Sequence, residues 1–207
     1  MVQLTTLLFP ALLAGSVAAS SSPFPGESLV ARQFGFACKP VVVIFARGTG
    51  EIPPIGTVVG PQFQAALGAR LGEGNSDFQS VPYDALISGY LVGGSPSGSS
   101  MMAQMVRQTV WSCPGSRIIM SGYSQGGQLV HNAGAQLDYA TAAGVAGAVI
   151  FGDPDYPQPV TNVPNLKVFC AAGDLICQGK PIILPPHLSY AANAGEAAEF
   201  VAQSVGF

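Results

Sequence analysis

The chain has 207 residues, of which 48% are hydrophobic and only 9% are charged, and its formal net charge is −3. This length suits one domain with a sizeable core and is too short for two domains of ordinary size. The low charge excludes a solvated disordered chain and a basic nucleic-acid-binding surface, and the small net charge points to no polyanionic or polycationic partner.

The first 19 residues have the pattern of a secretory signal peptide. An apolar run at residues 4–13 is too short to span a bilayer, and the small residues at 16–19 suit a signal peptidase. A hydrophobic N-terminal helix is the alternative. Residues 20–36 follow as an expected pro-segment or loose arm, and residues 37–207 are predicted to form one catalytic domain. We therefore expect a secreted, extracellular protein.

The chain has four cysteines, which suits a secreted protein: Cys38, Cys113, Cys170 and Cys177. An even number in a secreted chain favours two disulfides, although the sequence alone allows three pairings. Cys170 and Cys177 lie seven residues apart across a turn and are able to pair locally, which would leave Cys38 for Cys113. Because there is no CxxC pattern and only two histidines are present, we expect neither a metal site nor a cofactor.

From residue 40 onward, predicted strands alternate with predicted helices. Strands are expected at residues 40–48, 78–85, 117–122, 147–153 and 165–174, and helices at 61–71, 101–111, 126–137 and 194–205. A Gly- and Ser-rich loop is expected at residues 88–100. This alternation predicts an α/β fold, a three-layer sandwich with a mostly parallel five-stranded sheet between two helical layers.

Residues 122–126 read Gly-Tyr-Ser-Gln-Gly and lie between a predicted strand and a predicted helix. In a GxSxG turn the serine projects from a bend so tight that bulky neighbours would clash. Ser124 would then project at the carboxyl edge of the sheet, where open α/β sheets bind ligands. A glycine-rich bend is the alternative, but the strand and helix on either side favour a nucleophilic serine.

A serine nucleophile needs a base, and only two histidines are available. His131 lies seven residues along the helix behind Ser124, about 10 Å away by helix rise, and is interpreted as a structural residue. His187 lies in a loop with a double proline, which holds a side chain in a fixed place. His187 is therefore the predicted base.

Five aspartates compete for the acid: Asp84, Asp138, Asp153, Asp155 and Asp174. In α/β hydrolases the acid stands between serine and histidine in the chain, on a loop after a late strand. Asp174 follows the last predicted strand and is flanked by two cysteines. Asp153 and Asp155 also follow a strand, but the prolines beside them are typical of turn aspartates. Asp174 is therefore the predicted acid.

With these residues the chain resembles the fungal cutinases, small lidless serine esterases of the α/β-hydrolase fold. The matching stretches are VVVIFARGTGE (41–51), SGYSQGGQL (121–129), KVFCAAGDLICQG (167–179), PPHLSY (185–190) and EAAEFV (196–201). The resemblance implies Ser124 as nucleophile, His187 as base and Asp174 as acid. It also implies that Cys38 pairs with Cys113 and Cys170 with Cys177.

Two donors are expected for the oxyanion of the reaction. The N–H of Gln125, directly after the nucleophile, is one of them. The resemblance places the second on the hydroxyl residue after Ala-Arg-Gly, which is Thr49 in this chain. Family members often carry serine at this position, followed by threonine, whereas this chain reads Thr-Gly-Glu. The rotamer of Thr49 is therefore left open. The alternative is that Thr49 is only a turn residue.

Apolar residues before and after His187 and in the glycine-rich loop are candidates for two walls of an acyl groove. They are Tyr90, Leu91, Val92, Ile182, Ile183, Leu184 and Leu188. Packing in the core or in loops is the alternative for them. With such walls the substrate would be a short-to-medium aliphatic ester or an insoluble polyester surface, and the enzyme is expected to be a monomer without nucleic-acid or membrane partners. An acetylxylan esterase and a non-catalytic secreted surface or elicitor protein are the other candidate functions.

Overall fold

The computed structural model describes Met1 and residues 38–207; the predicted signal peptide and N-terminal arm lie largely outside these residues. A five-stranded sheet forms the middle layer, with the order β2-β1-β3-β4-β5 and every neighbouring pair parallel. Its strands are β1 Val41–Ala46, β2 Ser76–Ser80, β3 Arg117–Tyr123, β4 Val145–Phe151 and β5 Leu166–Phe169. The predicted parallel sheet of an α/β fold is thus confirmed.

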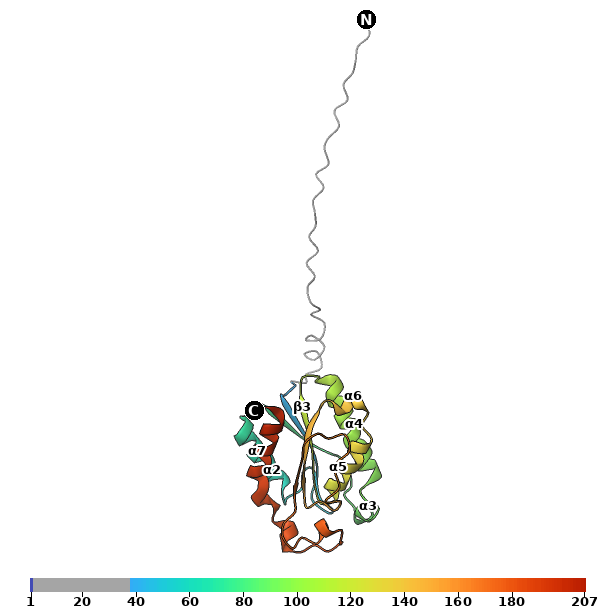
Figure 1. Ribbon diagram of the computed structural model, residues 1–207, viewed down its shortest axis with the longest axis vertical. Coiled ribbons are helices and arrows are strands. Elements are labelled where there is room, and N and C mark those ends of the chain that lie inside the picture. Colours follow the sequence, from blue (N-terminus) through green and yellow to red (C-terminus); the bar gives the residue numbers. More distant parts are fainter. Residues whose placement is uncertain (2–37) are drawn as a thin grey trace. The chain divides into compact units, whose positions relative to one another are not determined.

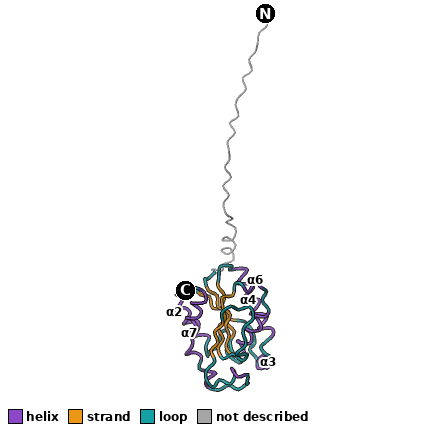
Figure 2. The backbone as a smooth tube through the Cα atoms, viewed as in Figure 1, coloured by secondary structure: helices purple, strands orange, loops and turns teal. Residues whose placement is uncertain are grey.

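Helices cover both faces of this sheet (Figure 1). One face carries α2 (Gly60–Leu71) and α7 (Ala194–Val205), which pack against each other. The opposite face carries α4 (Pro96–Ser112) and α5 (Gln125–Ala135), together with the short helices α3 (Ile87–Leu91) and α6 (Tyr139–Ala142). Figure 2 shows the strands lying between these two layers. The order of layers is the predicted three-layer sandwich.

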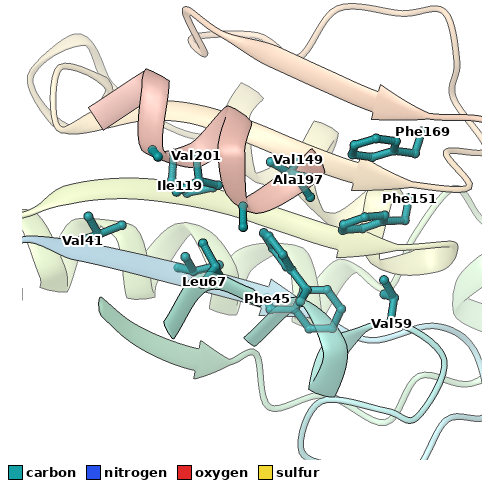
Figure 3. Packing of buried hydrophobic residues seen from close by; sticks show 14 of the residues in the cluster. Val41, Phe45, Val59, Leu67, Ile119, Val149, Phe151, Phe169, Ala197 and Val201 are labelled. Carbon is teal, nitrogen blue, oxygen red and sulfur yellow. The ribbon is translucent and has the colours of Figure 1, made fainter. Parts of the chain in front are cut away.

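The central strand β1 supplies side chains to two separate cores. Val41, Val43 and Phe45 point to the side of α2 and α7 (Figure 3), where the Phe45 ring lies 5.4 Å from the ring of partly buried Phe78. Val42 and Ile44 point to the side of α4 and α5. Because successive strand residues face opposite sides, a strand buried on both faces must be apolar throughout. This explains the uninterrupted Val-Val-Val-Ile-Phe run.

Two predicted segments were wrong in detail. The expected loop at 88–100 contains most of α3 and the first turns of α4, which begins at Pro96; Ser95 caps α4 by accepting a hydrogen bond from Gly98 N at 3.2 Å. Serine followed by proline is a helix-start signal that the high content of small residues concealed. The expected strand at 78–85 ends at Ser80, since Pro82 has no N–H to donate to a ladder.

Both disulfides are present, Cys38 with Cys113 and Cys170 with Cys177. The first joins the chain just before β1 to the connection between α4 and β3, and these two strands are neighbours in the sheet. The second closes a short loop directly after β5. Among the described residues, no helix combines the length and the apolar character that a membrane crossing requires.

Candidate active site

Ser124 occupies a tight turn between β3 and α5. Its backbone has φ 56° and ψ −120°, a left-handed φ that is unusual for any residue except glycine. The flanking glycines make this turn possible: a Cβ on Gly122 would overlap the backbone of Gly126, and a Cβ on Gly126 would overlap the backbone of Ala46. The backbone of Ser124 is therefore held in this turn at the carboxyl edge of the sheet.

His187 and Asp174 form a buried hydrogen-bonded pair. The distance from His187 Nδ1 to Asp174 Oδ2 is 2.8 Å, and the two residues are each 1% exposed. Asp174 Oδ1 accepts a further hydrogen bond from Ile176 N at 2.9 Å. A carboxylate that accepts the Nδ1 proton leaves the lone pair on Nε2. His187 Nε2 is buried and has no hydrogen-bond partner among the described residues.

Two tyrosines that the sequence did not single out fix this pair. Tyr190 donates its hydroxyl hydrogen to Asp174 Oδ2 at 2.5 Å. Tyr123 stacks on the His187 ring with centroids 5.0 Å apart, and its hydroxyl donates to the His187 carbonyl at 2.9 Å. Burial, followed by nearby carboxylates, raises the pKa of Tyr123 well above its ordinary value, so its hydroxyl keeps the proton that it donates. Tyr123 stands inside the GxSxG motif and Tyr190 ends the PPHLSY stretch, but the sequence assigned a role to neither.

The His187 ring lies beside the serine turn. Gly152 follows β4, and a side chain there would collide with the His187 ring. Directly before it, the Phe151 carbonyl accepts a hydrogen bond from Ser124 N at 2.9 Å. Tyr123, which directly precedes Ser124, stacks on the same ring. The residue before Ser124 and the residue after the neighbouring strand β4 therefore both lie against His187. Ser124, His187 and Asp174, which are far apart in sequence, thus meet at one edge of the sheet.

Thr49 lies in the turn after β1 and is hydrogen-bonded to the residue after Ser124. Gln125 Nε2 donates to Thr49 Oγ1 at 2.7 Å and to the Leu86 carbonyl at 2.8 Å, and Gln125 is fully buried. Because Thr49 Oγ1 accepts this bond, its own O–H remains free to donate. Within residues 38–207, neither the Thr49 N–H nor the Gln125 N–H has a hydrogen-bond acceptor. Three donors therefore stand unpaired beside Ser124.

A charged network fixes the turn that carries Thr49. The Glu51 carboxylate accepts hydrogen bonds from the N–H groups of Gly48, Thr57 and Val58 at 2.7 to 2.9 Å. The buried Arg47 side chain donates to the Glu51 carbonyl at 2.9 Å, on the opposite side of the turn. Such charge-assisted bonds are stronger than neutral ones, so the turn is rigid. The sequence identified Glu51 only as part of a motif.

The predicted wall residues lie on two exposed rims, one on α3 and the residue after it, the other on the segment around His187. None is buried: Leu91 is 66% exposed, Ile183 58% and Leu188 54%, and Tyr90, Val92, Ile182 and Leu184 are also partly or largely exposed. Core packing is therefore excluded as their role. We call these two groups the apolar rims.

His131, which is partly buried, and Asp153 form a second histidine–aspartate pair. His131 Nε2 lies 3.0 Å from Asp153 Oδ2, and Asp153 is fully buried. His131 is thus a structural residue, as predicted, but Asp153 is more than the predicted turn aspartate because it holds this ring. Asp155 adds a third possible ligand atom for a metal ion in the same region.

A parallel sheet covered by helices on both faces, with a serine on a strand-to-helix turn and a histidine–aspartate pair at the same edge, is the arrangement of the α/β hydrolases. The cutinase family model matches residues 37–205. The chain belongs to the cutinase family, which consists of carboxylic ester hydrolases.

Individual relatives agree with this family. The chain is 55% identical to a cutinase from Monilinia fructicola over 172 residues, which cover 82% of this chain and 85% of that protein. It is 49% identical to a cutinase from Botryotinia fuckeliana, with 88% and 89% covered. Among solved structures, Trichoderma reesei cutinase in complex with a phosphonate inhibitor matches at 41% identity and a TM-score of 0.78, covering 87% of this chain and 85% of that one. An acetylxylan esterase shares the fold at 20% identity and a TM-score of 0.67, with 82% of this chain and 100% of that one covered.

Proposed function

We propose that this chain is a secreted serine esterase that hydrolyses aliphatic esters, including those at the surface of an insoluble polyester. Ser124 is the nucleophile, His187 the general base and Asp174 the residue that orients His187. The observation that carries this proposal is the buried Asp174–His187 pair, whose free Nε2 belongs to a ring lying against the neighbours of Ser124.

In the first step His187 Nε2 takes the proton of Ser124, and the serine oxygen attacks the ester carbonyl carbon. The imidazolium that forms is stabilised by Asp174. It then returns the proton to the departing alcohol, and the acyl group remains on Ser124. A water molecule, deprotonated by the same nitrogen, releases the acid and regenerates the serine.

The charge that develops on the carbonyl oxygen is stabilised by the unpaired donors of Thr49 and Gln125. Preorganised donors of this kind are worth about 100- to 1,000-fold in turnover because they need no rearrangement during the reaction. The Gln125 side chain supports this role, since it occupies a lone pair of Thr49 Oγ1 and leaves the hydroxyl hydrogen for the oxyanion.

The apolar rims support an aliphatic substrate. They expose large side chains beside the triad, as a surface that contacts apolar material would require. A sharp preference for acetyl esters over longer acyl esters would contradict this assignment and favour an acetylxylan esterase. The two disulfides support secretion, because such bonds persist in oxidising compartments.

Two measurements test the proposal together. A fluorophosphonate should label Ser124 in the folded protein, and Ser124→Ala should lower hydrolysis of soluble esters and of an aliphatic polyester by at least about 10,000-fold. Circular dichroism would verify that the variant is folded. Absence of the adduct in folded wild-type protein would overturn the assignment of Ser124.

A further inference from the structure

The carboxylate of Asp174 accepts hydrogen bonds from two groups besides His187. Its Oδ2 atom accepts one from His187 Nδ1 at 2.8 Å and one from the Tyr190 hydroxyl at 2.5 Å. Its Oδ1 atom accepts one from Ile176 N at 2.9 Å. The Cys177 sulfur also lies 3.7 Å from Oδ2, but a disulfide sulfur has no hydrogen to donate. The predicted base and Tyr190 therefore share a single carboxylate oxygen.

The Tyr190 side chain is fixed by burial and by two hydrogen bonds. It is fully buried, and its ring meets the His187 ring edge to face, with centroids 6.1 Å apart. Ala171 N donates to the Tyr190 oxygen at 3.0 Å, and the hydroxyl donates in turn to Asp174. A hydroxyl that accepts a hydrogen bond becomes a stronger donor, because successive bonds polarise one another. Tyr190 is thus a strong and oriented donor to Asp174.

The Tyr190 hydroxyl also keeps its proton. Burial first, and then the hydrogen bond to Asp174, raises the pKa of Tyr190 well above its ordinary value; the charges of Asp174 and Tyr123 add to the shift, and the Ala171 N–H opposes it. A donor bonded to a carboxylate stabilises the negative charge on it. A carboxylate oxygen whose charge is shared in this way stabilises a neighbouring imidazolium less.

We propose that Tyr190 is a positioning residue that acts through Asp174: by sharing Oδ2 with His187, its hydroxyl weakens the stabilisation of the imidazolium and extends activity toward acidic pH. The imidazolium cannot accept the proton of Ser124, so activity falls at low pH where this form accumulates. Weaker stabilisation of this form moves the fall to lower pH. Because Tyr190 is fully buried, it does not contact the ester. The inference rests on the proposed esterase function and concerns how its base is controlled.

Other titratable groups near the pair act on Asp174 only through space. Tyr123 on β3 donates to a backbone carbonyl, and its pKa is raised by burial and then by the charges of Glu51 and Asp174. Tyr90 on α3 has its pKa raised by burial and then by the charges of Asp155 and Asp174. Within residues 38–207, none of these groups donates a hydrogen bond to the Asp174 carboxylate. Tyr190 is therefore the tyrosine whose removal changes that carboxylate directly.

The test compares the pH profile of kcat/KM for the full-length wild-type protein and Tyr190→Phe on a soluble butyrate ester. The variant keeps the buried ring and loses only the hydroxyl. The midpoint of the acid limb should rise by about 0.5 to 1 pH unit, as expected when a charged acceptor loses one of its donors. A merely structural role would lower the plateau and leave the midpoint in place, and that result would overturn the proposal.

Two further tyrosines provide matched controls. Tyr123→Phe removes a buried hydroxyl that is bonded to the His187 carbonyl and not to Asp174. Tyr139→Phe removes a hydroxyl from a side chain of α6 that is 92% exposed. Both variants should keep the wild-type midpoint. An equal rise in Tyr123→Phe would contradict the assignment, since loss of any hydroxyl near the ring would then have the same effect.

A second replacement tests the opposite direction. Site-specific incorporation of 3-fluorotyrosine at position 190 keeps the size of the side chain and makes its hydroxyl a stronger donor. The acid midpoint should then fall below that of wild type, and a rise would overturn the proposal. This replacement also serves if Tyr190→Phe does not fold, which circular dichroism would show.

Direct titration of the histidine separates this inference from the proposed function. Ser124-dependent hydrolysis with a wild-type midpoint in Tyr190→Phe would overturn the inference and leave the esterase function intact. If no ester is hydrolysed, the His187 ring is titrated by NMR in protein with labelled histidine, and the His131→Asn variant identifies which signals belong to it. A higher midpoint in Tyr190→Phe than in wild type would support the inference, and equal midpoints would overturn it.

Discussion

At the scale of single residues, the side-chain amide of Gln125 connects the turn that carries the proposed oxyanion donor Thr49 to the segment before α3. It bridges Thr49 Oγ1 and the Leu86 carbonyl, which stands directly before α3. The amide therefore ties the turn after β1 to the apolar rim on α3. The sequence predicts the backbone N–H of Gln125 as an oxyanion donor. The role of its side chain depends on a contact with Thr49, which lies 76 positions away in the chain.

Thr49→Ala should lower kcat by about 100-fold and leave KM nearly unchanged, because the lost donor acts in the transition state. Gln125→Leu should lower kcat by a smaller factor, since the Thr49 hydroxyl loses the bond that orients it. Steady-state kinetics on a soluble butyrate ester measures both. Thr49→Ser keeps the hydroxyl and is the matched control; a tenfold or larger rise in KM with unchanged kcat in Thr49→Ala would contradict the role.

His131 should make stability depend on pH. Burial lowers its pKa, but the hydrogen bond and charge of Asp153, the charge of Asp155 and the Pro159 backbone together outweigh burial, and the net pKa is raised above the ordinary value. A raised pKa means that protonated His131 stabilises the fold fully below its unfolded pKa of about 6.5, and that this contribution is lost as pH rises through the folded pKa.

The replacement His131→Asn should therefore reduce the free energy of unfolding more at about pH 5.5 than at about pH 9. Urea unfolding of wild type and variant at both pH values gives the comparison. All other titratable groups are present in both proteins, so the difference between them reports the pair of His131 and Asp153. An equal loss at the two pH values would show that the His131–Asp153 pair does not titrate in this way.

At the scale of elements, the two disulfides have different roles. Cys170 and Cys177 close the loop after β5 that carries Asp174, and they lie seven residues apart, whereas Cys38 and Cys113 lie 75 apart. In the chain-entropy model a longer loop loses more freedom when it is closed. The long disulfide is thus chiefly a constraint on the unfolded chain, and the short one holds the acid in position.

We expect the double variant Cys38→Ala/Cys113→Ala to lose about 4 to 5 kcal/mol of unfolding free energy, and Cys170→Ala/Cys177→Ala about 2.5 kcal/mol. For kcat the order should be the reverse: Cys170→Ala/Cys177→Ala should lose more than Cys38→Ala/Cys113→Ala, because only the short loop carries Asp174. Urea titration measures the loss of unfolding free energy of both variants, and steady-state kinetics measures their loss of kcat. This prediction would be refuted if the long-loop variant lost more in both quantities.

At the scale of the whole molecule, exposed apolar side chains gather around the proposed catalytic groups. The rims expose Leu91 and Leu188, and charged residues make up only 9% of the chain. Trp111 is also exposed, at 84%, but it lies in the last turn of α4, shortly before β3 begins, and so lies toward the amino edge of the sheet, opposite the site. It provides a matched apolar control.

Leu91→Ser/Leu188→Ser should slow hydrolysis of an insoluble aliphatic polyester by about tenfold more than hydrolysis of a soluble butyrate ester, since two apolar contacts with the surface are lost. Trp111→Ser should leave the ratio of the two rates unchanged. Release of soluble acid from a polyester film, normalised to the soluble rate, is the measurement. Equal slowing on both substrates would exclude a role for the rims in surface contact.

The sequence by itself determined the class of fold and narrowed the candidates for the proposed catalytic set. Alternation of buried strands with helices predicts the parallel sheet, and GxSxG with only two histidines leaves few choices for the triad, because these are local patterns of spacing and residue type. The loop at 88–100 was misjudged for the same reason: glycine and serine dominate its composition, while α3 and the start of α4 are stabilised by capping and by contacts with α5.

Only the tertiary structure decided how these groups are held and what surrounds them. Tyr190 reaches Asp174, Gln125 orients Thr49, and Glu51 binds three N–H groups of its own loop, and none of these contacts has a sequence pattern. A cavity lined by Tyr90, Asp155 and Pro181 likewise exists only where α3, the loop after β4 and the segment after η1 (Ile176–Gln178) come together. Hydrogen-bond satisfaction and burial depend on groups distant in the chain, so they are properties of the folded molecule rather than of any segment.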